Sequence, residues 1–252
     1  MDLQGQTAVV TGGSRGLGLG IVEALVDRGA NVTVVARSRH DLDAISRRLG
    51  VATISADITD RDVAMETLAR LRPGVLILNA GAPPEMGRID QLSWEAFSSS
   101  WEIDVKGGFH WIQAALAAPL APGSRVLVTS SGAAVGGSPL TGGYAGAKRM
   151  LWIMANYAEH LSTEKGLGIR FQTIIPRQQI GGTGIGDRAS TAYGKKLGIP
   201  AEEFLKRFGA PLPPRQLGEY VAHILEDPQY EQGRAFNLKG DTGLTVMEEA
   251  AA

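Results

Sequence analysis

The stretch TGGSRGLG at residues 11–18 follows the short apolar run TAVVT at 7–11 and opens a helical pattern. Gly12, Gly16 and Gly18 let the backbone turn tightly and approach a pyrophosphate, which then rests on the amino terminus of the helix. A glycine-rich turn alone is a weak signal, but its position between a strand and a helix, at the start of an alternating chain, strengthens it. The stretch predicts a dinucleotide-binding turn, and an ordinary strand-to-helix turn is the alternative.

Short apolar runs rich in β-branched residues alternate with helical patterns along the rest of the chain. The strands expected from them are 7–11, 31–36, 52–55, 75–79, 125–130, 169–175 and 234–238. Nearly continuous apolar strands separated by helices are typical of a parallel sheet covered on both faces. We therefore expect an α/β fold with a doubly wound parallel sheet of the Rossmann type, about seven strands, and ligands at the carboxyl ends of the strands.

The composition is that of an ordinary globular protein. The chain has 252 residues, 44% hydrophobic and 20% charged, so a single domain over 1–252 is the economical expectation. A formal net charge of −1 argues against a general binder of nucleic acid or of membrane surfaces. The absence of cysteine excludes disulfides and thiolate ligands, and the four histidines show no metal-ligand spacing, so no metal is expected.

The first residues, MDLQGQTAVVTGG, have neither the basic segment nor the apolar core of a signal peptide. No apolar run is long and uninterrupted enough to span a bilayer. We therefore expect a soluble, cytoplasmic protein.

Residues 177–215 interrupt the alternation between two expected strands. The segment is rich in glycine and proline and has room for only a helix or two. Segments of this length are usually functional or mobile, so we expect a lobe that covers the substrate. Tyr193, Phe204, Leu205 and Phe208 in this lobe suggest a partly apolar pocket, although core packing would explain them about equally well.

The end of the second expected strand bears on which dinucleotide binds. NAD-binding proteins usually place an acidic residue there, which bonds the adenosine ribose hydroxyl. Here VVARSRHD has Ala36 at that place with Arg37 next to it, and Arg15 lies inside the glycine turn. Two guanidinium groups suit a 2′-phosphate by charge and by forked geometry, so the sequence favours NADP(H). The alternative is that Arg37 and Arg39 merely cap a surface turn.

The stretch GGYAGAKRM at 142–150 places Tyr144 and Lys148 four residues apart. In a helix, this spacing brings both side chains to one face. Because a neighbouring ammonium favours the phenolate, we expect Lys148 to lower the pKa of Tyr144 from its usual value near 10 and to suit it for proton transfer. Two solvated residues on an exposed helix are the alternative.

Several such motifs occur together, in order and at matching spacing. They are TGGSRGLG at 11–18, Asp57 in ADITD, LNAG at 78–81, Ser131 in TSSGAA, the pair in YAGAK, and the proline that ends IRFQTIIP. Ser131 lies thirteen residues before Tyr144. On these motifs the chain resembles the short-chain dehydrogenases/reductases over essentially its whole extent.

The resemblance implies catalytic roles for three residues. Tyr144 would protonate a carbonyl oxygen as hydride arrives from the nicotinamide, or would act as the base in the reverse reaction. Lys148 would lower the pKa of the tyrosine and bond the nicotinamide ribose, and Ser131 would orient and polarise the carbonyl. The implied cofactor contacts are Gly12, Ser14, Arg15, Gly16, Leu17, Gly18, Arg37, Ser38, Asp57, Ile58, Asn79, Ala80, Gly81, Tyr144, Lys148, Pro176, Arg177 and Ile180.

Two departures from the family pattern lie after the sixth expected strand. Arg177 follows Pro176 where the family usually has a glycine. Gly181 stands where a threonine is usual, with Thr183 nearby. Both departures fall on the loop that would contact the nicotinamide.

The third departure is Asp104 in WEIDVKGGF, where the family usually has an asparagine. If Asp104 lies near Lys148, its charge would weaken the effect of the lysine on Tyr144, which makes it a fourth candidate catalytic residue. The alternative is that Asp104 points away and pairs with a helix dipole or a surface cation.

We expect an NADP(H)-dependent oxidoreductase that transfers hydride between nicotinamide and a small carbonyl or alcohol substrate, such as a ketone or aldehyde. The alternatives are an isomerase, dehydratase or imine-type reductase on the same scaffold, or a nucleotide-binding sensor with little turnover. The complete set Ser131, Tyr144 and Lys148 argues against a sensor. The helices at 94–116 and after Tyr144 are rich in large apolar groups and pair across a two-fold axis in the resembling family, so we expect a homo-dimer or homo-tetramer.

Overall fold

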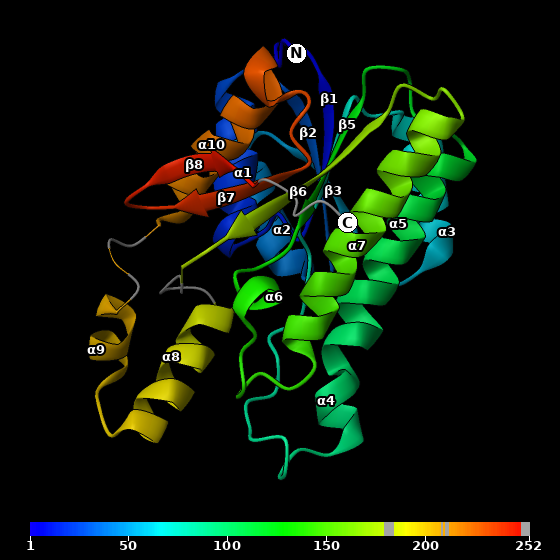
Figure 1. The fold of residues 1–252 in the computed structure, drawn as a ribbon. Helices are drawn as coiled ribbons and strands as arrows, with labels where there is room; N and C mark the ends of the chain where they lie inside the picture. Colours follow the sequence, from blue (N-terminus) through cyan, green and yellow to red (C-terminus); the bar gives the residue numbers. More distant parts are fainter. Residues whose placement is uncertain (179–183, 208, 210–211, 248–252) are drawn as a thin grey trace.

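The backbone forms one mixed sheet with helices on both faces (Figure 1). A computed structural model describes residues 1–178, 184–207, 209 and 212–247, and within these the sheet has eight strands. The strand order is β3-β2-β1-β4-β5-β6-β7-β8. The bounds are β1 Thr7–Thr11, β2 Asn31–Ala36, β3 Ala52–Ser55, β4 Val75–Leu78, β5 Arg125–Thr129, β6 Arg170–Pro176, β7 Ala235–Lys239 and β8 Gly243–Val246.

The expected fold class is confirmed, and the seven expected strands agree with β1 to β7 to within about one residue at each end. These seven strands run parallel. The eighth, β8, was not expected from the sequence. It pairs antiparallel with β7 as the return arm of a hairpin, and all of its residues are partly or fully exposed. A short strand with no buried face leaves no apolar pattern from which to predict it.

The sheet has a layer of helices on each face, and further helices lie beyond it. Their bounds are α1 Gly16–Asp27, α2 Arg39–Leu49, α3 Arg61–Leu71, α4 Trp94–Ser100, α5 Lys106–Ala117, α6 Ala133–Gly136, α7 Tyr144–Glu164, α8 Gly184–Leu197, α9 Ala201–Lys206 and α10 Pro214–Glu226, with a π-helical turn at Trp101–Val105 and a 3₁₀ turn at Pro228–Tyr230. Successive side chains of β1 point to opposite faces of the sheet. Val10 packs in the hydrophobic cluster of α1, α2 and α10, whereas Val9 packs in the cluster of α3, α5 and α7, so each face has its own layer of helices.

The order of the strands reverses at β1, which lies between β2 and β4. In open parallel sheets the connections leave on opposite faces at such a point, so a crevice opens beyond the carboxyl ends of the two central strands. The glycine turn follows β1 directly. The fold therefore places this turn at the crevice.

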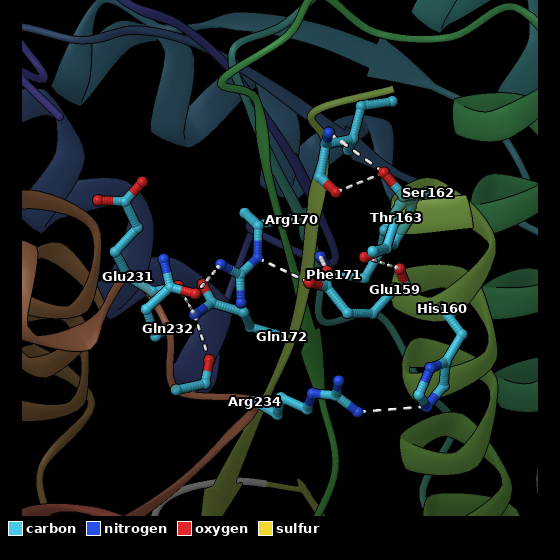
Figure 2. A network of polar contacts seen from close by, with 12 residues as sticks. Glu159, His160, Ser162, Thr163, Arg170, Phe171, Gln172, Glu231, Gln232 and Arg234 are labelled. Atoms are coloured by element: carbon cyan, nitrogen blue, oxygen red, sulfur yellow. Dashed lines mark hydrogen bonds and ion pairs between the residues drawn. The ribbon is translucent and has the colours of Figure 1, made fainter. Parts of the chain in front are cut away.

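Helix α7 is anchored at its far end by buried polar contacts (Figure 2). Glu159 accepts a hydrogen bond from the backbone N–H of Phe171 at 2.7 Å and pairs with Arg170 at 2.8 Å. The Ser162 hydroxyl donates to the carbonyl oxygen of Ile169 at 2.7 Å. Because α7 is a continuous 21-residue helix, these contacts with β6 and the turn before it also set the position of its first turn.

Helices α8 and α9 project beyond the sheet, on the side where α6 lies (Figure 1). They belong to the segment 177–215, for which a substrate-covering lobe was expected, and α10 begins before that segment ends. Among the described residues, no helix has both the length and the apolar character needed to cross a membrane.

Candidate active site

A cleft of about 940 Å³ opens at the carboxyl ends of the parallel strands. Most of the expected site residues line it. They are Gly12, Ser14, Arg15, Gly16, Leu17, Arg37, Ser38, Asp57, Ile58, Asn79, Ala80, Gly81, Ser131, Tyr144, Lys148, Pro176 and Arg177. Gly18 and Asp104 do not line this cleft, and Ile180, Gly181 and Thr183 lie outside the described residues.

The glycine turn has the geometry expected of an anion cradle. Gly12 has a φ of +68°, and a Cβ built there would lie 2.7 Å from the Cα of Ala80, so only glycine fits. No described side chain caps the amino terminus of α1, which leaves its first N–H groups available to an anion. Gly18 supports the turn without lining the cleft. A Cβ there would lie 2.2 Å from the carbonyl oxygen of Gly12, so this glycine allows the close packing of helix and turn.

Thr11, which the sequence analysis did not single out, holds the two central strands together. Its hydroxyl accepts hydrogen bonds from the backbone N–H groups of Asn79 at 3.1 Å and Ala80 at 3.2 Å. The Asn79 amide in turn donates to the carbonyl oxygen of Gly12 at 3.3 Å. These contacts fix the loop after β4 against the glycine turn. The signal available in the sequence was Thr11, a polar residue at the end of the apolar run TAVVT.

The end of the cleft near β2 and β3 carries both signs of charge. Arg15 and Arg37 are exposed and line it, together with Asp41 and Asp57. Asp57 accepts hydrogen bonds from the N–H and hydroxyl of Thr59, both at 2.9 Å. The backbone bond from Thr59 is the main cause that lowers the pKa of Asp57, and Arg37 contributes to the same shift. Arg39, by contrast, pairs with Asp43 along α2 and does not line the cleft.

Tyr144 and Lys148 lie at the other end, on the first turn of α7. Both are buried, with 6% and 3% of their surface exposed, and the Lys148 Nζ lies 5.7 Å from the centroid of the tyrosine ring. Ser131 follows β5 and interacts with the phenol. Its neighbour Ser130 donates to the carbonyl oxygen of Lys148 at 2.8 Å, which ties α7 to the end of β5. The helical spacing expected from the sequence is therefore present, and the alternative of two solvated residues is excluded.

Lys148 lowers the pKa of Tyr144, as expected, but the expectation of a lowered pKa overall was wrong. Burial raises the pKa of Tyr144 above its usual value, and this effect outweighs the opposing influence of Lys148 and Ser131. The charge of Asp104 raises the pKa of Tyr144 further. The phenol is therefore held in its neutral, proton-carrying form at neutral pH.

Asp104 lies in the π-helical turn and points toward the lysine. Its Oδ2 lies 3.0 Å from the Lys148 Nζ, as an ion pair without a well-angled hydrogen bond, and only 1% of the residue is exposed. Its Oδ1 accepts a hydrogen bond from the backbone N–H of Ala82 at 2.8 Å. Burial alone would lower the pKa of Lys148, but Asp104 and Tyr144 raise it overall, so the ammonium keeps its proton. The alternative in which Asp104 points away is excluded.

The lobe contributes an aromatic wall to the cleft. Tyr193 and Phe204 both line it and stack with their ring centroids 5.2 Å apart. The Tyr193 hydroxyl contacts the hydroxyl of Ser138 at 2.8 Å and accepts from the backbone N–H of Leu140 at 3.2 Å. Leu205 does not line the cleft, and Phe208 lies outside the described residues.

The doubly wound sheet carries a glycine cradle where its strand order reverses. A serine, a tyrosine and a lysine lie at the other end of the same cleft. This framework is typical of a dinucleotide-dependent oxidoreductase. The model of the short-chain dehydrogenase family matches residues 6–179. The chain belongs to this family, as the motifs indicated.

Similar proteins include enzymes named for cyclic diols and for a sugar. Cis-1,2-dihydrobenzene-1,2-diol dehydrogenase of Pseudomonas putida is 30% identical, with 100% of this chain and 96% of that protein covered. Cis-2,3-dihydrobiphenyl-2,3-diol dehydrogenase of Rhodococcus globerulus is 34% identical, with 99% and 94% covered. L-xylulose reductase of Bos taurus is 33% identical, over 42% of this chain and 45% of that protein.

The fold also matches a solved structure. A crystal structure of a variant of actinorhodin polyketide ketoreductase with NADPH superposes with a TM-score of 0.78, covering 94% of this chain and 96% of that one. The two sequences are 22% identical, so this likeness concerns the fold alone.

Proposed function

We propose that the protein is an NADP(H)-dependent oxidoreductase that interconverts a carbonyl compound and its alcohol. The observation that carries the proposal is the geometry of one cleft, in which the uncapped glycine turn lies at one end and Tyr144, Lys148 and Ser131 lie at the other. When bound, the nicotinamide would supply or accept the hydride. The protein would supply the proton, the orientation of the substrate and the exclusion of water.

The residues present fit a phosphorylated dinucleotide. The pyrophosphate would lie against the glycine turn, where a Cβ at Gly12 would fill the available space. Arg15 and Arg37 line the cleft beside Ala36, where an acidic residue would otherwise favour NAD.

In reduction, the neutral Tyr144 would donate its proton to the substrate oxygen. Tyr144 carries its proton at neutral pH, so it can act as the acid, and Lys148, charged through Asp104, would stabilise the phenolate that remains. Ser131 would donate a hydrogen bond to the same oxygen. The lobe, through Tyr193 and Phe204, would cover the substrate on the open side.

The proposal is tested by following NADPH consumption. Cyclic ketones, hydroxyketones and keto sugars are assayed with NADPH, and cyclic diols with NADP⁺, beside a fluorescence titration of cofactor binding. We expect both binding and turnover. Tight binding of NADPH with no turnover of any member of the panel would contradict the proposal and favour a sensor.

Cofactor preference gives a second prediction. NADPH should bind more tightly than NADH, and Arg37→Ala should remove most of the difference, because a charge-assisted contact to phosphate contributes at least about tenfold in affinity. Ala36→Asp should shift the preference toward NADH. Dissociation constants for both cofactors are measured by titration, with Arg39→Ala as the control, since Arg39 does not line the cleft. Equal affinities in the wild type would rule out the role of Arg37.

We also propose that the protein assembles as a homo-dimer or homo-tetramer. Large apolar side chains are exposed at Trp94, Trp101, Phe109 and Tyr157, on α4, the π-helical turn, α5 and α7. A monomer would leave these groups in water, whereas a second copy would cover them. Light scattering should report a dimer or tetramer, and Phe109→Glu should weaken it. A monomeric wild type at micromolar concentration would contradict this proposal.

A further inference from the structure

Arg177 lies at the end of the cleft near Ser131 and has no ion-pair partner among the described residues. The residue is half-buried, lines the cleft and follows β6 directly. Its guanidinium forms no hydrogen bond or ion pair with any side chain or backbone group of the described residues. Its backbone N–H donates to the carbonyl oxygen of Leu238 at 3.0 Å, which fixes the Cα.

The backbone of Arg177 packs beside the catalytic serine. Gly132, the residue after Ser131, donates its N–H to the carbonyl oxygen of Pro176 at 2.8 Å. A Cβ built at Gly132 would lie 3.2 Å from the Cα of Arg177. The Cα of Arg177 therefore lies next to the segment of Ser131, whose hydroxyl would hold the substrate oxygen.

The charges along the cleft are divided between its two ends. The only carboxylates that line the cleft among the described residues are Asp41 and Asp57, which follow β2 and β3. Three strands (β1, β4 and β5) lie between β2 and β6, a separation of roughly 19 Å. At that distance the aqueous cleft screens their charge. Lys148 is neutralised by Asp104, so among the described residues that line the cleft no carboxylate is left near Arg177 to balance its charge.

The walls at this end are otherwise mostly apolar. Ile103, Ile185, Ala189, Tyr193 and Phe204 line the cleft there, with Ser138, Thr141 and Gln178 among its uncharged polar groups. A half-buried guanidinium in such surroundings is best satisfied by a carboxylate, which it can bind through two parallel hydrogen bonds. An apolar wall with one cation suits a substrate that has an apolar body and one anionic group.

We propose that Arg177 binds a carboxylate on the substrate, so that the protein acts on carboxylated hydroxy or keto compounds with an apolar body. This inference rests on the proposed function for the identity of the reacting group. The carboxylate would lie against Arg177 while the reacting oxygen lies at Ser131 and Tyr144. Arg177 is thus a specificity-determining residue in place of the glycine that the family usually has.

The test is a binding experiment that does not depend on turnover. Cyclohexanecarboxylate and its neutral counterpart cyclohexanecarboxamide are titrated calorimetrically into the wild-type protein saturated with NADP⁺. We expect the carboxylate to bind at least about tenfold more tightly, as for other charge-assisted hydrogen bonds. Arg177→Met should erase the difference and Arg177→Lys should restore part of it. Arg188→Met, an exposed arginine of α8 outside the cleft, should retain it.

The outcomes separate this proposal from its alternatives. Equal binding of the two ligands by the wild type, or no binding of the carboxylate, overturns the proposal without the need for any variant. A loss of NADP⁺ affinity in Arg177→Met with an unchanged ratio of the two ligands assigns the guanidinium to the cofactor phosphates and also overturns it. If the ratio behaves as expected but no carbonyl panel turns over, the proposed reaction fails while the carboxylate site stands.

Discussion

Tyr144→Phe should lower the turnover number by about 10²–10⁴-fold, which is the usual effect of removing a general acid–base group. The substitution removes the hydroxyl and keeps the buried ring, so the packing of the first turn of α7 is preserved. The dissociation constant of NADPH should stay within a few-fold, since the role proposed for the hydroxyl is proton transfer and not cofactor binding. Turnover and cofactor affinity are measured on the same preparations.

Tyr157→Phe is the matched control. It makes the same change on the same helix, at a side chain that does not line the cleft, and it keeps the aromatic ring that the proposed interface would cover. Its rate should equal that of the wild type. If Tyr144→Phe also kept the wild-type rate, Tyr144 would not be the proton donor, and the proposed mechanism would be wrong.

Substitution of Asp104 is expected to have the second largest effect. Two variants separate the loss of its contacts from the loss of its charge alone. Asp104→Ala leaves a buried ammonium at Lys148 and a buried N–H at Ala82 without their partner. Breaking a buried ion pair in this way typically destabilises a protein by about 3–5 kcal/mol. Asp104→Asn keeps an oxygen for Ala82 and removes only the charge, so it should remain folded. Urea unfolding of the three proteins measures the difference, and an Ala variant as stable as the wild type would contradict the assigned contacts.

The pH profile of Asp104→Asn follows from the sign of its effect on Tyr144. The carboxylate raises the pKa of Tyr144, so its loss should lower that pKa. Alcohol oxidation needs the phenolate and increases as the pH rises through this pKa, so its profile should move to lower pH. Asp41→Asn, at the distant end of the cleft, is the control and should leave the profile in place. An unchanged profile in Asp104→Asn would show that its charge does not reach Tyr144, and a shift to higher pH would show that Lys148 had lost its proton.

The carboxylated-substrate proposal and the Asp104 predictions concern two positions where this chain departs from its family. In both cases a charged residue stands beside the residues for which a catalytic role is proposed. Asp104 is paired with Lys148 behind the cleft, whereas Arg177 has no partner among the described residues. On the proposed mechanism, Asp104 would therefore tune the pKa of the proton donor, and Arg177 would be available to a ligand.

The sequence by itself determined the layers, the cradle and the spacing of the catalytic pair. Nearly continuous apolar runs predicted most of the strands from β1 to β7, because a strand buried on both faces has apolar residues at most positions. The run around Gly12 predicted the cradle, since only glycine tolerates a positive φ at such close approach. Tyr144 and Lys148 were placed on one face of a helix because that periodicity is local.

Only the tertiary structure decided what these groups experience. Asp104 and Lys148 lie far apart in the chain, and the π-helical turn and α7 bring them to 3.0 Å. The direction of the Tyr144 pKa depends on burial by several segments, which outweighed the neighbouring lysine that the sequence makes visible. Similarly, the stacking of Tyr193 on Phe204 and the isolation of Arg177 follow from how the lobe and β6 meet the cleft. Local periodicity depends only on neighbouring residues, whereas burial and charge pairing arise only where distant segments pack together.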